Sequence, residues 1–102
     1  MSIKKKYAKN KLSCKVTFCV FEEIGPETRQ VHLIGDFNGW DICATPMKPR
    51  KGGSFSVTVD LEPKRTYQFR YLVNGSHWIN DHGADDYVYC PFGRCDNCLV
   101  VV

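Results

Sequence analysis

Residues 54–75 read SFSVTVDLEPKRTYQFRYLVNG and contain two runs in which apolar and polar side chains alternate. In residues 55–61 every second side chain is Phe, Val or Leu, and the side chains between them are Ser, Thr and Asp. In residues 67–73 the aromatic residues and Val alternate with Gln, Arg and Leu. A period of two is typical of a β-strand with one buried face. Pro63 separates the runs, and the pair Asn74 and Gly75 favours a two-residue hairpin turn. The stretch therefore predicts two strands followed by a chain reversal.

The same alternation recurs toward both ends of the chain. It begins at residue 14, is broken by Gly25 and Pro26, and resumes at residue 31 until a turn at residues 36–40. After the hairpin we expect a short return strand, an acidic loop and a final strand. No pattern predicts a helix longer than one turn. Short strands about ten residues apart, with turn residues between them, predict an all-β fold, an immunoglobulin-like antiparallel β-sandwich. The expected strands begin at Cys14, Val31, Phe55, Tyr67 and Trp78, and the last occupies residues 99–102.

Length and charge indicate one nearly neutral domain. The chain has 102 residues, a common size for a domain with a single core. The net charge is +3, and five lysines lie within the first eleven residues. We therefore expect residues 1–12 to be a basic tail that is disordered, frays or packs loosely on an edge, and residues 13–102 to form one domain. Because the remainder lacks an extended positive stripe, nucleic acid is not an expected partner.

The pattern of apolar residues predicts a cytoplasmic protein. No apolar stretch follows the basic amino-terminal residues, as it would in a secretory signal. No apolar run is long enough to span a membrane, so a membrane is not an expected partner. In the cytoplasm the six cysteines would mostly remain thiols, and their pairing is left open.

Two segments resemble the isoamylase-type early-set domain family. These are VHLIGDFNGW at residues 31–40 and YQFRYLVNG at residues 67–75, followed by Trp78. The family includes the glycogen-binding module of the AMP-activated kinase β subunit and the amino-terminal domains of starch-branching and debranching enzymes. The resemblance covers about residues 13–102 and implies an early-set, carbohydrate-binding-like fold. Many members of the family serve as structural domains beside a catalytic barrel.

The resemblance also implies a carbohydrate-binding site. In this sequence Arg70 stands where the kinase module has lysine, Phe92 where it has leucine, and Asp96 where it has asparagine. One extra residue precedes the second tryptophan. The implied carbohydrate-binding residues are Trp40, Arg70, Trp78, Phe92, Asp96 and Asn97.

The chemistry of these residue types suits a neutral glucan. A glucose unit has faces of C–H groups, which pack on flat aromatic rings, and a rim of hydroxyl groups. Arg70 lies on the opposite strand face from Phe69 and Tyr71, so its guanidinium is expected on the wet side of the sheet and can donate to sugar oxygens. Asp96 would accept hydrogen bonds and Asn97 could donate or accept. The expected function is a stand-alone, non-catalytic module that binds α-linked glucan, meaning glycogen, starch or maltooligosaccharides.

Three of these residues also have a structural alternative. Trp40 could simply cover the edge of the sandwich, and Phe92 could belong to the core. Arg70 could form a surface ion pair with Asp60 or Glu62. The alternative function is a structural or protein-interaction early-set domain that does not bind sugar. A glycan-metabolising enzyme or another protein is a further possible partner.

The cysteines allow one metal hypothesis. Cys90, Cys95 and Cys98 have the spacing C-x4-C-x2-C, and with His82 or Cys43 they could hold zinc. The spacing is not a standard zinc pattern, and small thiols are ordinary core residues. We therefore expect neither a metal nor another cofactor.

Catalysis is not expected from this sequence. The acid–base candidates are His82 and the aspartates at positions 81, 85 and 86, which we interpret as a solvated acidic loop. The glucan enzymes that carry a similar domain place catalysis in a separate barrel of roughly 250 residues. The sequence contains no such region.

Overall fold

The computed structural model describes residues 3–10, 12–21, 24–90 and 95–102, and gives only the backbone of Cys90, Cys95 and Asp96. Strands make up nearly all of its regular structure. No helix in this described part is both long enough and apolar enough to cross a membrane. The two helical segments are the short 3-10 turns η1 (Asp36–Asn38) and η2 (Lys51–Gly53). The strands are β1 (Ile3–Tyr7), β2 (Cys14–Val20), β3 (Val31–Gly35), β4 (Lys48–Pro49), β5 (Phe55–Leu61), β6 (Thr66–Val73), β7 (His77–Ile79), β8 (Asp86–Cys90) and β9 (Cys95–Val101).

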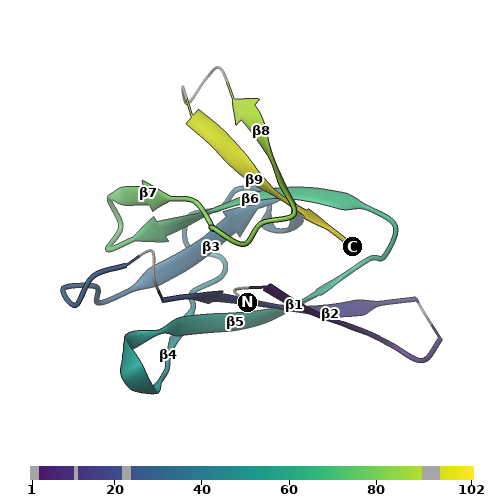
Figure 1. The fold of residues 1–102 in the computed structure, drawn as a ribbon, viewed down its shortest axis with the longest axis horizontal. Helices are drawn as coiled ribbons and strands as arrows, with labels where there is room; N and C mark the ends of the chain where they lie inside the picture. The colour runs from purple at the N-terminus through teal and green to yellow at the C-terminus, as the bar shows by residue number, and fades with distance from the viewer. Residues whose placement is uncertain (1–2, 11, 22–23, 91–94) are drawn as a thin grey trace.

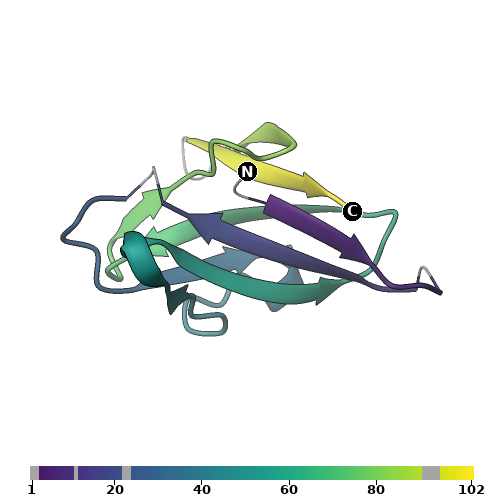
Figure 2. The same cartoon turned by 60° about the horizontal axis from the view of Figure 1, so that its bottom comes forward.

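The strands form two antiparallel sheets that pack face to face. The first sheet has the order β1-β2-β5-β4, and Figure 2 shows β1, β2 and β5 side by side in front. The second has the order β3-β6-β9-β8, with β7 also paired to β6. In Figure 1 the second sheet lies above the first, and the β8–β9 hairpin projects away from the rest of the molecule. The prediction of an all-β, immunoglobulin-like antiparallel sandwich is confirmed.

The core lies between the inner faces of the two sheets. On β2, Val16, Phe18 and Val20 are fully buried, as their alternation predicted. On β6, Phe69 and Tyr71 are fully buried as well. The Phe18 and Phe69 rings meet edge to face with centroids 5.0 Å apart, which joins the central strands of the two sheets. The period of two therefore assigns the buried face of both strands correctly.

The predicted reversal at Asn74 and Gly75 joins β6 to β7. Both residues have positive φ, 52° and 73°, and the Ser76 N–H donates to the Val73 carbonyl at 3.2 Å. Because Val73 pairs with His77, the loop contains three residues rather than the two expected. The Asn74 side-chain oxygen also accepts hydrogen bonds from the backbone N–H groups of Arg29 and Gln30, at 2.8 and 3.1 Å. The turn is thus fastened to the segment that leads into β3, and β7 returns in register with Leu72 opposite Trp78.

The structure differs from the expected loose tail over residues 3–7. These residues form β1, which pairs with β2 from Ile3 opposite Phe18 to Tyr7 opposite Cys14. Ile3 is buried, and the Tyr7 hydroxyl donates to the Val102 carbonyl at 3.2 Å. Three consecutive lysines hide the strand pattern in the sequence, and one of them, Lys5, lies on the same side of the strand as Ile3 and binds Asp85 instead of packing in the core.

The acidic segment was also expected to be a solvated loop, and this is only partly correct. Its end, from Asp86 onward, forms strand β8, which pairs with β9. The final strand accordingly begins at Cys95 rather than at residue 99. Asp81 is fully buried rather than solvated.

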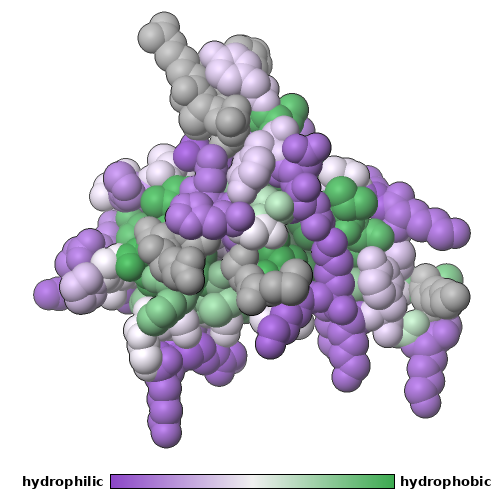
Figure 3. All heavy atoms as spheres, in the orientation of Figure 1, coloured by the Kyte–Doolittle hydropathy of each residue, from purple (hydrophilic) through white to green (hydrophobic). Residues whose placement is uncertain are grey.

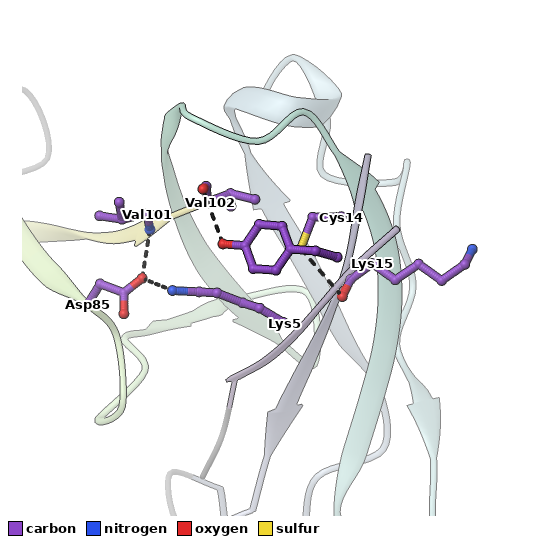
Figure 4. Close-up of polar contacts among 7 residues, drawn as sticks. Lys5, Cys14, Lys15, Asp85, Val101 and Val102 are labelled. Atoms are coloured by element: carbon purple, nitrogen blue, oxygen red, sulfur yellow. Dashed lines mark hydrogen bonds and ion pairs between the residues drawn. The ribbon is translucent and has the colours of Figure 1, made fainter. Parts of the chain in front are cut away.

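Asp85 ties β1 to the second sheet (Figure 4). Its Oδ2 accepts a hydrogen bond from the Lys5 Nζ at 2.6 Å and another from the Val101 backbone N–H at 2.7 Å. Partial burial favours the protonated carboxyl, but the Lys5 hydrogen bond, the Val101 N–H and the Lys5 charge outweigh it. They hold the pKa of Asp85 below its ordinary value.

We expect Asp85→Asn to destabilise the fold near neutral pH and to lose this effect in acid. The pKa of the Asp85 carboxyl is lower in the folded state than in the unfolded state, so its negative charge stabilises the fold at any pH above the unfolded-state pKa. This stabilisation is lost as the pH falls through the folded-state pKa. Because both side chains are partly exposed, the effect should not exceed about 1 kcal/mol. Urea unfolding at about pH 7 and about pH 3 measures it. Asp60→Asn, which breaks the more exposed pair with Lys15, should cost less. A deficit for Asp85→Asn that persists unchanged in acid would contradict the assignment.

Candidate functional site

Arg70 and Trp78 lie on the outer face of the second sheet, the face that points away from the core, and Trp40 follows the turn at the end of β3 in the same sheet. Since Phe69 and Tyr71 of β6 are buried in the core, the residues between and beside them point outward. These are Gln68, Arg70 and Leu72. Leu72 does not belong to the core cluster between the sheets, but it is only 4% exposed. Neighbouring side chains on the outer face therefore cover it.

Trp78 and Arg70 lie against each other on this face. Trp78 pairs with Leu72 across β6 and β7, and directly opposed residues share a face of the sheet. Its side chain is 40% exposed. The Arg70 guanidinium carbon lies 5.7 Å from the centroid of the Trp78 ring, a cation–π distance. The Arg70 Nε donates to Asn80 Oδ1 at 2.8 Å, so both the ring and the amide orient the guanidinium.

Trp40 is fixed at the end of β3 by the turn that follows this strand. Its indole Nε1 donates to Asp36 Oδ1 at 2.9 Å, and Asp36 Oδ2 accepts from the Gln68 backbone N–H at 2.8 Å. Asn38 fastens the same turn, because its side chain accepts from the Gly35 N–H and donates to the Leu33 carbonyl. The Trp40 side chain is 36% exposed. The ring is thus held beside Gln68 without being buried.

Gly35 allows β3 to approach β6 closely at this point. A Cβ on Gly35 would lie 2.5 Å from the Gln68 carbonyl oxygen and 2.9 Å from the Phe69 Cβ. Any larger residue would push the strands apart and move the Asp36 contact to Gln68 with them. Gly35 therefore positions Trp40 indirectly, through the contact between Asp36 and Gln68.

Trp40, Arg70 and Trp78 are all connected to strand β6. Trp40 is tied through Asp36 to Gln68, Arg70 is the next outward residue of β6, and Trp78 lies opposite the one after it. Gln68 and Leu72 are four residues apart, or about 13 Å along the strand. Trp78 therefore lies against the oriented Arg70 guanidinium, and Trp40 is connected through Asp36 to the backbone of β6 two residues before Arg70.

The other predicted residues are placed differently. Asn97 of β9 is 8% exposed, and its Nδ2 donates to Gln68 Oε1 at 3.0 Å, so it supports Gln68 from within the sheet. Phe92 lies outside the described residues. The backbone of Asp96 pairs with Tyr89, and its side chain is outside the described part. The roles of Phe92 and Asp96 in sugar binding stay predictions.

The alternative ion pairs of Arg70 are wrong. Asp60 accepts instead from Lys15, with Nζ to Oδ1 at 3.1 Å, and Glu62 pairs with Arg65 at 3.0 Å. The alternation did not identify Asn80, which directly follows β7 and comes opposite Arg70 when the β6–β7 register, with Tyr71 opposite Ile79, is continued by one residue.

The buried Asp81 organises the segment after β7. Its carboxylate accepts hydrogen bonds from the Tyr71 hydroxyl and from the Gly83 N–H, and its own N–H donates to the Cys98 Sγ at 3.2 Å. The Tyr87 hydroxyl donates to its carbonyl. Asp81 therefore has a structural place between β6, β9 and β8, whereas the neighbouring His82 is exposed.

The residues of the zinc hypothesis are separated where the structure describes them. Cys98 is fully buried, while Cys43 and His82 are exposed. Cys90 and Cys95 are paired in the β8–β9 register, and their side chains are outside the described part. Among the residues that are described, no three His, Cys, Asp or Glu side chains gather in a metal-binding group. The zinc hypothesis gains no support from these positions.

Comparison with known proteins agrees with this geometry. The family model described as carbohydrate-binding module 48 (isoamylase N-terminal domain) matches residues 6–93. The chain is similar to the 1,4-alpha-glucan branching enzyme GlgB of Synechococcus sp. (strain CC9605), at 33% identity over 87 residues, 84% of this chain and 11% of that enzyme. It is also similar to GlgB of Aquifex aeolicus (strain VF5), at 32% identity over 74 residues, 72% of this chain and 12% of that enzyme. The chain thus spans only about a tenth of the length of these relatives.

Proposed function

Because the chain belongs to the carbohydrate-binding module 48 family, we propose that it binds α-linked glucans and does not catalyse a reaction on them. The ligand class is glycogen, starch or maltooligosaccharides. The names of the relatives support this class, since they are 1,4-alpha-glucan branching enzymes and the chain matches only a small part of each.

The observation that carries the proposal is the arrangement along β6. Trp40 and Trp78 are both partly exposed, and Arg70 lies between their attachment points. Indole rings offer flat apolar surfaces for the C–H faces of glucose, and a guanidinium donates hydrogen bonds to its hydroxyl oxygens. A neutral glucan carries no charge, so ions in solution should screen its binding only weakly.

The surroundings of the site reduce the cost of binding. Asp36 holds the Trp40 indole, and Asn80 and Trp78 hold the Arg70 guanidinium. Side chains that are already ordered lose less conformational entropy when a ligand arrives. The contacts already present in the structure should therefore favour glucan binding.

Affinity electrophoresis tests the proposal. The protein is run in native gels with and without glycogen, beside albumin as a non-binding reference and with a β-linked glucan as the control polymer. We expect retardation by glycogen alone, and the same retardation when the salt concentration is raised. A folded protein that migrates equally in all gels would refute the proposal and favour a structural or protein-interaction domain.

Replacing Arg70 by Gln should weaken maltoheptaose binding about tenfold. A hydrogen bond that involves a charged group contributes roughly 1.5–3 kcal/mol. We expect a smaller contribution here because Arg70 is partly exposed. Isothermal titration calorimetry measures the change. Arg65→Gln is the matched control, since Arg65 also lies over an aromatic ring, 5.8 Å from the Tyr67 centroid, but precedes β6. Equal affinities of the parent and Arg70→Gln would exclude Arg70 from the site.

A further inference from the structure

Two asparagines orient neighbouring polar side chains of β6. On one side β6 pairs first with β9 and then with β7, and the two pairings stop on either side of Arg70. Asn80, which follows β7, accepts from the Arg70 Nε at 2.8 Å through its Oδ1. Asn97 of β9 donates from its Nδ2 to Gln68 Oε1 at 3.0 Å. Gln68 is thus oriented by a side-chain amide, as Arg70 is.

Gln68 lies on the same outer face of the second sheet as Arg70. The two residues are two positions apart on β6, or about 7 Å along the strand. Gln68 is partly exposed. Its backbone N–H donates to Asp36, which also holds the Trp40 indole. The Gln68 side chain therefore stands beside Arg70 and next to the attachment of the turn that carries Trp40.

The Gln68 amide has donors left for a ligand. A glutamine side chain has one carbonyl oxygen and an NH2 group with two donors. The hydrogen bond from Asn97 uses the oxygen and fixes the direction in which the amide points. Among the described residues none accepts from the Gln68 Nε2. Asn97 is only 8% exposed, so a ligand on this face reaches Gln68 more readily than Asn97.

The two outer faces of the sandwich differ in charge. On the first sheet the outward side chains of β1 and β2 include Lys4, Lys6 and Lys15, which are all exposed. Figure 3 shows long hydrophilic side chains projecting from the lower side of the molecule, where this sheet lies in Figure 1. On the second sheet Gln68 places an uncharged amide beside the Arg70 guanidinium. An amide forms hydrogen bonds without carrying a charge, which suits an uncharged ligand.

We propose that Gln68 is a further glucan-binding residue, which donates from its Nε2 to a sugar hydroxyl oxygen near the one bound by Arg70, and that Asn97 is a positioning residue that acts through Gln68. This inference rests on the proposed function. Hydroxyl groups recur on every glucose unit, so two donors about 7 Å apart on one face can bind two of them. Asn97 then contributes by orienting the Gln68 amide and not by contacting sugar.

Gln68→Met should weaken maltoheptaose binding about three- to tenfold, the usual contribution of a hydrogen bond between uncharged groups. Methionine keeps the length of the side chain and lacks the amide donors. Isothermal titration calorimetry measures the affinity, and urea unfolding checks the fold. Gln30→Met is the matched control, because Gln30 is exposed in the segment before β3. A folded Gln68→Met protein with the affinity of the parent would overturn the proposal.

Asn97→Ala separates a positioning role from a direct contact. Without Asn97 the Gln68 amide rotates freely and loses entropy when the ligand binds, so the affinity should fall, by a smaller factor than in Gln68→Met. In the Gln68→Met background the same substitution should change the affinity by less than about twofold, because the residue through which Asn97 acts is gone. Equal losses in both backgrounds would overturn the positioning role and indicate that Asn97 contacts the sugar itself.

The parent protein distinguishes failure of this inference from failure of the proposed function. If the parent does not bind maltoheptaose, the proposed function fails, and the roles of Gln68 and Asn97 fail with it. If the parent binds and the folded Gln68→Met variant binds equally well, the function stands and only the assignment of Gln68 is overturned.

Discussion

Trp78→Ala should abolish the retardation of the protein by glycogen and weaken maltoheptaose binding by at least about 30-fold, or 2 kcal/mol, the usual cost of truncating a dominant tryptophan contact. The indole supplies a flat surface that is 40% exposed on the outer face. Its removal also deprives the Arg70 guanidinium of the ring that lies 5.7 Å away. One substitution therefore removes the stacking surface and loosens the principal donor. Calorimetry with maltoheptaose and electrophoresis in glycogen gels measure the two effects.

Two further variants control for a general loss of structure in this experiment. Phe21→Ala removes another exposed aromatic side chain, at the end of β2 in the other sheet, and should bind as the parent does. Trp78→Phe keeps a smaller flat ring and should retain part of the affinity. The circular dichroism of all variants should match that of the parent. A folded Trp78→Ala protein that binds maltoheptaose normally would remove Trp78 from the site.

Phe18→Ala should have the largest effect on stability, a loss of about 3–5 kcal/mol in the free energy of unfolding. Phe18 is fully buried on β2, and its ring contacts those of Phe37 and Phe69, at centroid distances of 5.8 and 5.0 Å. A cavity there would separate the two sheets at their centre. Since a domain of this size is stable by only about 5–15 kcal/mol, the midpoint of urea unfolding should fall sharply.

Thr58→Ala is the control for the core substitution. Thr58 lies on the exposed face of β5, where its hydroxyl meets that of Thr17 at 2.8 Å. Loss of this surface contact should cost less than about 1 kcal/mol. Similar costs for the two variants would mean that Phe18 is not a central contact between the sheets.

Sequence patterns predicted the central strands well because burial imposes a period of two on them. In β2, β5 and β6 the alternation identifies both the strand and its inward face. The edge strands follow no such rule. In β1 three lysines interrupt the pattern, and in β8 most side chains are exposed, so neither strand had a hydrophobic period to detect. Edge strands are recognised by their partners, which are remote in the sequence.

The sequence proposed candidate site residues but did not identify the side chains that orient them. Family resemblance selected Trp40, Arg70 and Trp78, which the structure arranges along β6. The side chains that orient them, Asp36 and Asn80, act through the geometry of a turn and of a hairpin. No local pattern marks such contacts, because they depend on where the chain returns after a reversal.

The buried Asp81 fixes the connection between β7 and β8 at one point. Its hydrogen bonds to Tyr71, Gly83 and Cys98 hold the backbone at one fixed point between β7 and β8. Residues added to or removed from the turn before Trp78 can change how far that indole reaches, while the strands beyond Asp81 keep their register. We therefore expect a change in the length of this turn to move Trp78 and to leave the pairing of β8 with β9 unchanged.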